Sequence, residues 1–391
     1  MHVDKRNTKL NPWYKVMISP KVFYNWLAEN QVDFFSGVPD SLLKDICAYI
    51  TDNTPKNSHI IAANEGNAVA LAAGYHIATK KTPLVYMQNS GIGNAVNPLI
   101  SLADKQVYKI PILLLIGWRG EPGVKDEPQH ITQGEITLSL LETMKIPYQI
   151  LSDNEDDAYQ QVHEAISEIR NTGTSYAIVV KKGTFGKYTI KEKILADYEF
   201  CREDVIKQML NQLAGDEIIV STTGKTSREL FECRANLEQP HHFDFLTVGS
   251  MGHSSQIALA IALNKPQRKV ICLDGDGALL MHMGSLAITG NMGPPNFVHI
   301  LINNGAHESV GGQPTVAFNM DIPALALASG YKKATTVTTA NELEKVLKDV
   351  SPEACPMLIE VKVRVGSRDD LGRPTVKPID NKRAFMQNLE H

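Results

Sequence analysis

Short apolar segments alternate with longer amphipathic segments along most of the chain. In the first half, helical patterns separate most of five apolar segments, at residues 32–38, 59–63, 83–87, 111–117 and 176–182. Continuous apolar segments of this length are typical of parallel strands that are buried on both faces of a sheet. The first half of the sequence therefore predicts a parallel α/β domain.

A charged stretch at residues 186–204 interrupts this alternation, which then resumes. The second half has apolar segments at residues 217–224, 243–249, 269–277, 297–304 and 356–363. We expect two doubly wound α/β domains with parallel sheets, at residues 1–185 and 205–391, joined by a linker at 186–204. Since ligands of such sheets bind at the carboxyl ends of the strands, residues at those ends are the first candidates for chemistry.

Polar, glycine-rich sequences follow two of the expected strands in the second half. "GDG" follows one strand and "NN" follows the next, with 25 residues, Ala278 to Ile302, between them. A helix and a return strand fit that interval, so the two corners should lie side by side. A carboxylate, an amide oxygen and a backbone carbonyl suit Mg²⁺, which completes its shell with phosphate oxygens and water. Because glycine lets backbone N–H groups approach phosphate, the sequence predicts a Mg²⁺–diphosphate site.

The spaced GDG and NN corners resemble the signature of thiamine-diphosphate (ThDP) enzymes. The resemblance implies ThDP and Mg²⁺ as cofactors, bound by a pyrimidine-binding (PYR) and a diphosphate-binding (PP) domain with no middle domain. It also implies that the metal ligands are Asp276, Asn304 and the carbonyl of Ala306. The residues expected beside the phosphates are Gly275, Gly277 and Ala278, although the family often has serine at the last position.

Two further stretches of the second half fit the same family. In "VGSMGHSS", Met251 would be the apolar wedge that bends the cofactor, and the carbonyl of Gly249 would bind its aminopyrimidine. A core methionine is the alternative for Met251. In "STTGKTS", the phosphate and pyrimidine loop would consist of Thr222, Thr223 and Gly224.

The first half contributes one acidic residue to this resemblance. "AANEGNAVALAAGY" places Glu65 directly after an apolar strand, where the family has the glutamate that protonates the cofactor's pyrimidine. The alternative is an acid that complements a helix dipole. In the family this glutamate and the diphosphate site come from different subunits, which implies a homodimer or a larger homo-oligomer.

Four longer stretches resemble the phosphonopyruvate decarboxylases within that family: "FSGVPDSLLKD", "QNSGIGNAVNPLISL", "GWRGEPGVKDEPQH" and "NNGAHESVGGQPT". This resemblance implies a carboxy-lyase that converts 3-phosphonopyruvate to phosphonoacetaldehyde and CO2 during the synthesis of natural phosphonates. Sulfopyruvate decarboxylases are the alternative, since their substrate differs only in its anion. Carboligases are a more remote alternative because they normally carry the middle domain, and a non-enzymatic relative should lack Glu65 or Asp276.

The phosphonate of such a substrate should be bound by cations. The expected loop from Trp118 to Gln133 contains Arg119, Lys125 and His130, and Lys181 and Lys182 end the following strand. Arginine suits a bidentate contact with phosphonate. Solvated surface charge is the alternative for the lysines.

Asp40 matches the position of an active-site acid in related 2-oxoacid decarboxylases, and it would deliver a proton after CO2 has left. The alternative is an N-cap for the helix that follows. His130 is expected to pair with Asp40. Pyruvate decarboxylases have a further glutamate where this chain has Val310, and His307 or Glu308 could take its place.

Composition and charge exclude several other classes of protein. The chain of 391 residues has 43% hydrophobic residues, a net charge of −4 and no basic tail, which argues against nucleic acid as its main partner. Its five cysteines form no CxxC motif, so we expect neither disulfides nor a zinc site but a reducing cytoplasm. Residues 1–17 lack the apolar core of a signal peptide. The apolar segment Ile110 to Trp118 is shorter than the roughly 20 residues of a membrane span.

Overall fold

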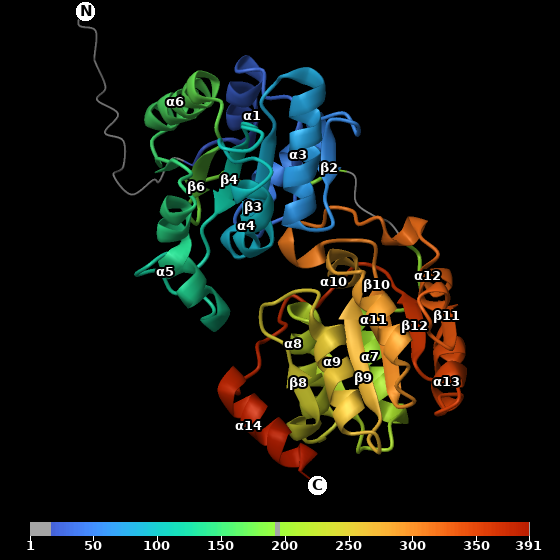
Figure 1. Ribbon diagram of the computed structural model, residues 1–391. Coiled ribbons are helices and arrows are strands. Elements are labelled where there is room, and N and C mark those ends of the chain that lie inside the picture. Colours follow the sequence, from blue (N-terminus) through green and yellow to red (C-terminus); the bar gives the residue numbers. More distant parts are fainter. Residues whose placement is uncertain (1–16, 192–195, 391) are drawn as a thin grey trace, which may run out of the picture. The chain divides into compact units, whose positions relative to one another are not determined.

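The computed structural model of the chain describes residues 17–191 and 196–390 (Figure 1). The chain divides after Ile190 into two compact units. Residues 186–190 of the expected linker belong to the first unit, and helix α7 of the second unit already begins at Arg202. Residues 192–195 of that linker, and residues 1–16 of the stretch tested for a signal peptide, lie outside the described residues.

The first unit contains a six-stranded sheet in the order β2-β1-β3-β4-β6-β5, in which every pairing is parallel. Its strands are β1 (Phe35–Gly37), β2 (His59–Ile61), β3 (Leu84–Gln88), β4 (Leu113–Gly117), β5 (Tyr148–Ile150) and β6 (Tyr176–Val180). Its α-helices are α1 (Pro20–Glu29), α2 (Lys44–Asn53), α3 (Glu65–Thr79), α4 (Ile92–Ile100), α5 (Pro128–Thr143) and α6 (Glu155–Thr172), and a 3-10 turn, η1 (Asn89–Gly91), precedes α4.

The second unit contains another six-stranded parallel sheet, in the order β11-β12-β10-β9-β7-β8. Its strands are β7 (Ile218–Ser221), β8 (Asp244–Leu246), β9 (Val270–Gly275), β10 (Phe297–Asn303), β11 (Lys333–Val337) and β12 (Met357–Lys362). Its α-helices are α7 (Arg202–Gln212), α8 (Lys225–Asn236), α9 (Ser254–Asn264), α10 (Asp276–Met281), α11 (Ser285–Met292), α12 (Ile322–Ala328), α13 (Ala340–Lys348) and α14 (Pro378–Leu389). The 3-10 turns are η2 (His241–Phe243), η3 (Glu308–Val310) and η4 (Ala317–Asn319).

The two sheets have the same strand order. Read from β8, the second sheet runs β8-β7-β9-β10-β12-β11, which repeats the order of the first sheet strand for strand. In each sheet the winding reverses between the first and third strands along the chain, β1 and β3 or β7 and β9. This confirms the expected pair of doubly wound domains, in which ligands bind beside such a reversal point.

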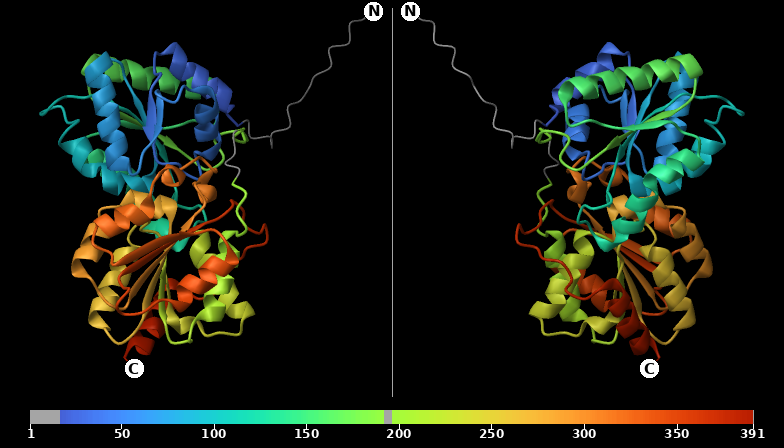
Figure 2. Two further views of the ribbon diagram at one scale, coloured as in Figure 1. Left: turned by 90° about the vertical axis from the view of Figure 1, so that its right-hand side faces the viewer. Right: turned by 90° about the vertical axis from the view of Figure 1, so that its left-hand side faces the viewer.

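Helices cover both faces of each sheet (Figure 2). In β3, Leu84 and Tyr86 pack in a core with α1, α2 and α6, whereas Val85 and Met87 pack in a second core with α3 and α4. Successive residues of a strand point to opposite faces, so both sets are buried. This two-sided burial explains why the central strands are apolar without interruption.

The segment from Ile110 to Trp118 contains the buried strand β4, as expected of a core strand. Within residues 17–191 and 196–390, no helix combines the length and apolar character that crossing a membrane requires. The prediction of a loop from Trp118 to Gln133 was wrong in its second part, because α5 begins at Pro128. Proline suits the first turn of a helix, where its missing N–H costs no hydrogen bond.

Candidate active site

A pocket opens in the second unit at the carboxyl ends of β7, β9 and β10, and it encloses about 560 Å³, part of it open to solvent. Gly275 of β9 lies opposite Ile302 of β10, so the GDG and NN corners are neighbours as expected. Nine of the residues predicted from the sequence line this pocket: Thr222, Thr223, Met251, Gly275, Asp276, Gly277, Ala278, Asn304 and Ala306.

The three residues expected to ligate the metal line this pocket, and hydrogen bonds hold the side chains of two of them, Asp276 and Asn304. Thr315 donates a hydrogen bond of 2.6 Å from its Oγ1 to Oδ2 of Asp276. Asn304 donates from Nδ2 to Glu308 at 2.9 Å and accepts from the backbone N–H of Ala306 at 3.1 Å. Burial raises the pKa of Asp276 to about 6, against the lowering effect of Thr315 and nearby N–H groups. A buried carboxylate beside an amide oxygen is a favourable setting for a hard cation.

The start of helix α8 forms another wall of the pocket. Gly224 precedes the helix with φ +93°, a conformation that favours glycine. The hydroxyl of Ser227 donates to the carbonyl of Thr222 at 2.6 Å, which holds the turn against the helix. The first N–H groups of a helix have no partner within it, and the helix dipole favours an anion there. The turn therefore suits a phosphate group.

Met251 lies in a tight turn between Gly249 and Gly252. The backbone N–H of Gly249 donates to Oγ1 of Thr223 at 3.0 Å, which ties this turn to the phosphate-binding turn. Both glycines have positive φ, +71° and +85°. Because Met251 is only half-buried and lines the pocket, its position favours the wedge over a core methionine.

A group of charged residues that the sequence did not predict as a group also lines the pocket. Arg202 binds both oxygens of Glu229 and one oxygen of Glu308, and Lys225 binds the other oxygen of Glu308 at 3.0 Å. Burial acts to raise the pKa of Glu308, but Arg202 and Lys225 outweigh burial and lower it. Glu308 is therefore held as a carboxylate. Burial lowers the pKa of His307 to about 4.

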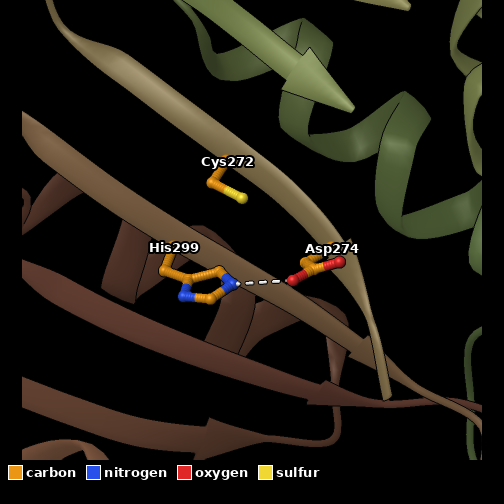
Figure 3. A group of neighbouring side chains, drawn as sticks. All are labelled: Cys272, Asp274 and His299. Atoms are coloured by element: carbon orange, nitrogen blue, oxygen red, sulfur yellow. Dashed lines mark hydrogen bonds and ion pairs between the residues drawn. The ribbon is translucent and has the colours of Figure 1, made fainter. Parts of the chain in front are cut away.

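Three buried side chains that do not line the pocket lie close together: Cys272 and Asp274 on β9 and His299 on β10 (Figure 3). Their ligand-type atoms lie within 4.8 Å of one another. Nε2 of His299 lies 3.3 Å from Oδ2 of Asp274, whose Oδ1 accepts hydrogen bonds from Ser254 and from the backbone N–H of Gly275. Nδ1 of His299 lies 3.2 Å from the hydroxyl of Tyr331, so both ring nitrogens have a protein partner without a metal ion. The contact with Asp274 fixes the amide of Gly275 at the edge of the pocket.

In the first unit, Glu65 is the first residue of α3 and its side chain is buried, with 5% of the residue exposed. Asn94 donates from Nδ2 to Oε2 of Glu65 at 2.8 Å. The carboxyl group lies over Gly91, where an added Cβ would come within 2.2 Å of Oε1. Burial raises the pKa of Glu65, while the hydrogen bond from Asn94 opposes this rise. A carboxyl group in this setting is suited to sharing a proton.

Asp40 follows β1 and is fully buried. Its Oδ2 accepts hydrogen bonds from the backbone N–H groups of Leu42 and Leu43, at 3.0 and 3.2 Å, so this oxygen caps the turn before α2. Its Oδ1 is buried and has no hydrogen-bond partner among the described residues. Burial raises the pKa of Asp40 to about 6, despite these hydrogen bonds and the nearby Arg119. One oxygen thus stabilises the turn, and the other has no partner among the described residues.

Arg119 follows β4 and is paired within its own loop. Its Nε and Nη2 bind the two oxygens of Asp126, and Nη1 donates to Ser41 at 2.7 Å. Lys125 is exposed. His130 is buried in the first turn of α5, where burial and then Arg119 lower its pKa. The expected pairing of His130 with Asp40 was wrong, because Nδ1 of His130 lies 3.4 Å from Oε1 of Gln133, whereas Oδ1 of Asp40 has no partner among the described residues.

Comparison with known proteins decides the family. Residues 20–141 match the N-terminal TPP-binding domain of thiamine pyrophosphate enzymes, and residues 222–361 match the C-terminal TPP-binding domain. The chain belongs to the thiamine pyrophosphate enzyme family.

Several curated members of this family are similar over most of their length. The chain is 33% identical over 365 residues to phosphonopyruvate decarboxylase of Streptomyces viridochromogenes, which covers 90% of this chain and 89% of the relative. It is 32% identical over 387 residues to phosphonopyruvate decarboxylase of Streptomyces hygroscopicus, covering 95% and 94% of the two chains. Identity to sulfopyruvate decarboxylase of Methanosarcina acetivorans is 26% over 387 residues, covering 93% of this chain and 96% of that one.

The pocket fits the diphosphate end of thiamine diphosphate, the cofactor of this family. It combines a carboxylate, an amide oxygen and a backbone carbonyl with the start of a 12-residue helix, α8. At Gly277 an added Cβ would come within 3.2 Å of the ring of His307, a closer contact than most Cβ atoms make.

Sequence reasoning missed some residues that shape this site. Arg202 could not be recognised as a site residue in the sequence, because it is one of many charged residues in the stretch 186–204. Lys225 belongs to the "STTGKTS" turn, so its proximity to the phosphate site could have been expected. Asp126, Asn94 and Thr315 fix predicted residues through hydrogen bonds that depend on the tertiary fold.

Proposed function

We propose that the protein decarboxylates 3-phosphonopyruvate, releasing CO2 and leaving phosphonoacetaldehyde. The observation that carries this proposal is the similarity to two phosphonopyruvate decarboxylases, which extends over both domains at 33% and 32% identity. Sulfopyruvate decarboxylase is a more distant relative at 26% identity. The phosphonate substrate is therefore better supported than the sulfonate.

The proposed cofactors are thiamine diphosphate and Mg²⁺. Thiamine diphosphate, when bound, supplies the electron sink that decarboxylation requires. Asp276, Asn304 and the carbonyl of Ala306 would hold Mg²⁺, whose shell diphosphate oxygens and water would complete. The other residues that would contact the cofactor are Thr222, Thr223, Gly224, Gly249, Met251, Gly275, Gly277 and Ala278.

The proposed catalytic residues are Glu65, Asp40 and His130. Each turnover replaces the carboxylate of the substrate by one proton, so a proton donor is needed near the reacting carbon. The buried Oδ1 of Asp40 and the pKa of about 6 for this residue suit that role. Glu65 would hold a proton at the pyrimidine ring, and the lowered pKa of His130 leaves its imidazole neutral and able to accept a proton near pH 7.

Arg119 and Lys125 are the proposed ligands of the phosphonate. A guanidinium group has five N–H donors, and Asp126 and Ser41 engage three of them in Arg119. Because Asp126 neutralises the charge of Arg119, the pair would add little net charge to the site. The remaining N–H groups of Arg119 would bind the phosphonate mainly through directional hydrogen bonds. Lys125 would add a charge from the exposed part of the same loop.

The proposed assembly is a homodimer or larger homo-oligomer in which Glu65 of one chain serves the diphosphate site of another. We also propose a cytoplasmic location. All five cysteines lie within the described residues and are free thiols, which is consistent with a reducing compartment.

A substrate panel tests the reaction. We expect kcat/KM to decrease from 3-phosphonopyruvate to sulfopyruvate to pyruvate, with a difference of about 10⁴-fold or more between the first and the last, because pyruvate has no anion for the remaining N–H groups of Arg119 to bind. Arg119→Ala should impair phosphonopyruvate turnover far more than residual pyruvate turnover. CO2 release and aldehyde formation should be measured together.

Arg170→Ala is the control, since Arg170 donates to the carbonyl of Asn30 in the first unit and has no proposed role in the site. Faster turnover of sulfopyruvate would favour the alternative decarboxylase. A product in which the carbon skeletons of two ketoacid molecules are joined would identify a carboligase. An equal effect of Arg119→Ala on all three ketoacids would mean that Arg119 does not read the phosphonate.

A further inference from the structure

The side-chain amide of Asn304 has two ends with opposite hydrogen-bonding character. Its oxygen can ligate a cation, whereas its NH2 group can only donate hydrogen bonds. Nδ2 donates to Oε2 of Glu308 at 2.9 Å, and Oδ1 accepts the N–H of Ala306 at 3.1 Å. A carbonyl oxygen has two lone pairs, so Oδ1 retains one for a metal ion.

Glu308 is itself fixed from two helices. Arg202 of α7 donates to its Oε2 at 2.9 Å, and Lys225 of α8 donates to its Oε1 at 3.0 Å. Only 10% of the Glu308 side chain is exposed. Arg202 is in turn held by both oxygens of Glu229, at 2.6 and 2.8 Å. The carboxylate that faces Asn304 therefore has little freedom to move.

We propose that Glu308 is a positioning residue that selects the metal-binding orientation of the Asn304 amide. This inference rests on the proposed Mg²⁺ site. In the opposite orientation Oδ1 of Asn304 would face the carboxylate of Glu308, acceptor against acceptor, and the NH2 group would face the cation. Glu308 makes that arrangement unfavourable at its own end of the amide, and the N–H of Ala306 would then face the NH2 group at the other end. Mg²⁺ would therefore meet a ligand that needs no reorientation.

The inference separates two roles that a buried carboxylate near a cation can have. Glu308 could favour Mg²⁺ simply through its negative charge, or it could act through the orientation of Asn304. The Asn304→Asp variant distinguishes them, because the two oxygens of a carboxylate are equivalent and no orientation has to be selected. The effect of Glu308 on metal affinity should then depend on the residue at position 304 only if Glu308 acts through orientation.

Binding of Mn²⁺, as a paramagnetic stand-in for Mg²⁺, provides a readout independent of turnover. Free Mn²⁺ would be followed by electron paramagnetic resonance in a titration of each purified chain with saturating thiamine diphosphate. We expect Glu308→Gln to weaken Mn²⁺ binding by about 10–100-fold, as is typical when a partner of a metal ligand is lost. In the Asn304→Asp background, Glu308→Gln should leave the affinity unchanged, since the carboxylate at position 304 has no orientation to be selected.

Glu203→Gln is a matched control. The Glu203 side chain is 7% exposed and, like Glu308, it binds two cationic side chains, Lys207 and Arg368. It does not line the pocket, so its replacement should leave Mn²⁺ affinity at the wild-type value. Circular dichroism of each variant would establish that it is folded.

Equal Mn²⁺ affinity of Glu308→Gln and the wild type would overturn the inference. So would a loss of the same factor in the wild-type and Asn304→Asp backgrounds, which would assign Glu308 a purely electrostatic role. If the wild type binds no Mn²⁺ even with thiamine diphosphate, the proposed cofactor site itself is wrong. The positioning role would be supported if Glu308→Gln weakens Mn²⁺ binding only in chains that retain Asn304, and if Glu203→Gln binds Mn²⁺ like the wild type.

Discussion

Glu65 and Glu155 occupy the same position in two helices of the first unit. Each is the first helical residue after an asparagine N-cap, Asn64 or Asn154, whose side chain accepts an N–H of the first turn. Glu155 is exposed, whereas Glu65 is buried and bonded to Asn94. The pair therefore separates an effect on the helix from an effect on the chemistry.

We expect Glu65→Gln to leave thiamine diphosphate binding largely intact but to slow deuterium exchange at C2 of the bound cofactor by about 10²–10⁴-fold, the usual contribution of a positioned proton carrier. Glu155→Gln should leave exchange unchanged. Both changes remove the same charge from a helix start, where it contributes typically about 0.3–1 kcal/mol. Equal exchange rates in both variants would assign Glu65 only to its helix.

Asp40 should leave a pH signature in stability. Its pKa is raised to about 6 by burial, whereas an aspartate in the unfolded chain has a pKa of about 3.9. Between these values the folded chain retains a proton that the unfolded chain has lost. Stability therefore falls as pH rises through this window. Asp40→Asn removes this loss, so the variant should gain stability relative to the wild type as pH rises from about 4 to above 6.

Urea unfolding at pH 4.5 and 7.5 measures this difference, and the relative gain should be at most about 3 kcal/mol, from the roughly two-unit shift at about 1.36 kcal/mol per unit. Asp33→Asn is the control, because hydrogen bonds from Lys81 and Tyr75 and the charge of Lys81 outweigh burial and lower the pKa of Asp33. Its contribution to stability therefore changes only below about pH 4, and the relative stability of Asp33→Asn should be nearly the same at pH 4.5 and 7.5. A relative stability of Asp40→Asn that is independent of pH would show that Asp40 is not held in a raised-pKa setting.

The sequence predicted those site residues that follow a strand directly, and it missed those that depend on a distant partner. Asp276 and Asn304 stand next to the ends of β9 and β10, so strand pairing alone brings them together. The partner of Glu308, Arg202, lies 106 positions earlier in the chain. Nothing in the local sequence around either residue encodes that pairing.

At the level of elements, ten of the twelve strands correspond to apolar segments, and the two that were not predicted, β5 and β11, are both at sheet edges. The residues of β5 are all half-buried, and β11 has one fully buried residue, Val337. An edge strand pairs with only one neighbouring strand and is less buried, so it can be short and contain polar residues. The apolar signal that identifies a central strand is then absent.

In the loop after β4, two glycines are required by close packing that the sequence pattern does not reveal. An added Cβ at Gly117 would come within 2.1 Å of Oδ2 of Asp40, and one at Gly120 would come within 1.8 Å of the carbonyl oxygen of His130. Both glycines therefore allow β4 and its loop to approach the candidate catalytic residues. The sequence identified Asp40, Arg119 and His130, but not the two glycines that let them pack together.

The repeated topology of the whole molecule places both halves of the proposed site on corresponding strands. The residues after β1 and β4 include Asp40 and Arg119, and the residues after the corresponding strands β7 and β10 include Thr222 and Asn304. Two copies of one sheet topology thus present different chemistry from the same edge. The first unit carries the proposed proton carriers, and the second unit carries the proposed Mg²⁺ and diphosphate ligands. A complete active site therefore requires a first unit and a second unit to come together.

The proposed assembly makes those surfaces meet between chains, and complementation tests it. Glu65→Gln disables the first unit and Asp276→Ala the second, so each homo-oligomer should be nearly inactive. In a mixed dimer, one site would carry both defects and the other would be intact. Random pairing of equal amounts gives about half mixed dimers, so about a quarter of all sites should be active.

Co-expression of the two variants with different affinity tags, followed by sequential purification, would isolate the mixed dimer, in which half of the sites should be active. Each variant co-expressed with itself is the control and should remain inactive. If instead Glu65 served the diphosphate site of its own chain, every site in the mixed dimer would carry one defect. Absence of recovered activity in a verified mixed dimer would therefore reject the shared site. Recovery of about half of the wild-type activity would show that each site contains residues of two chains.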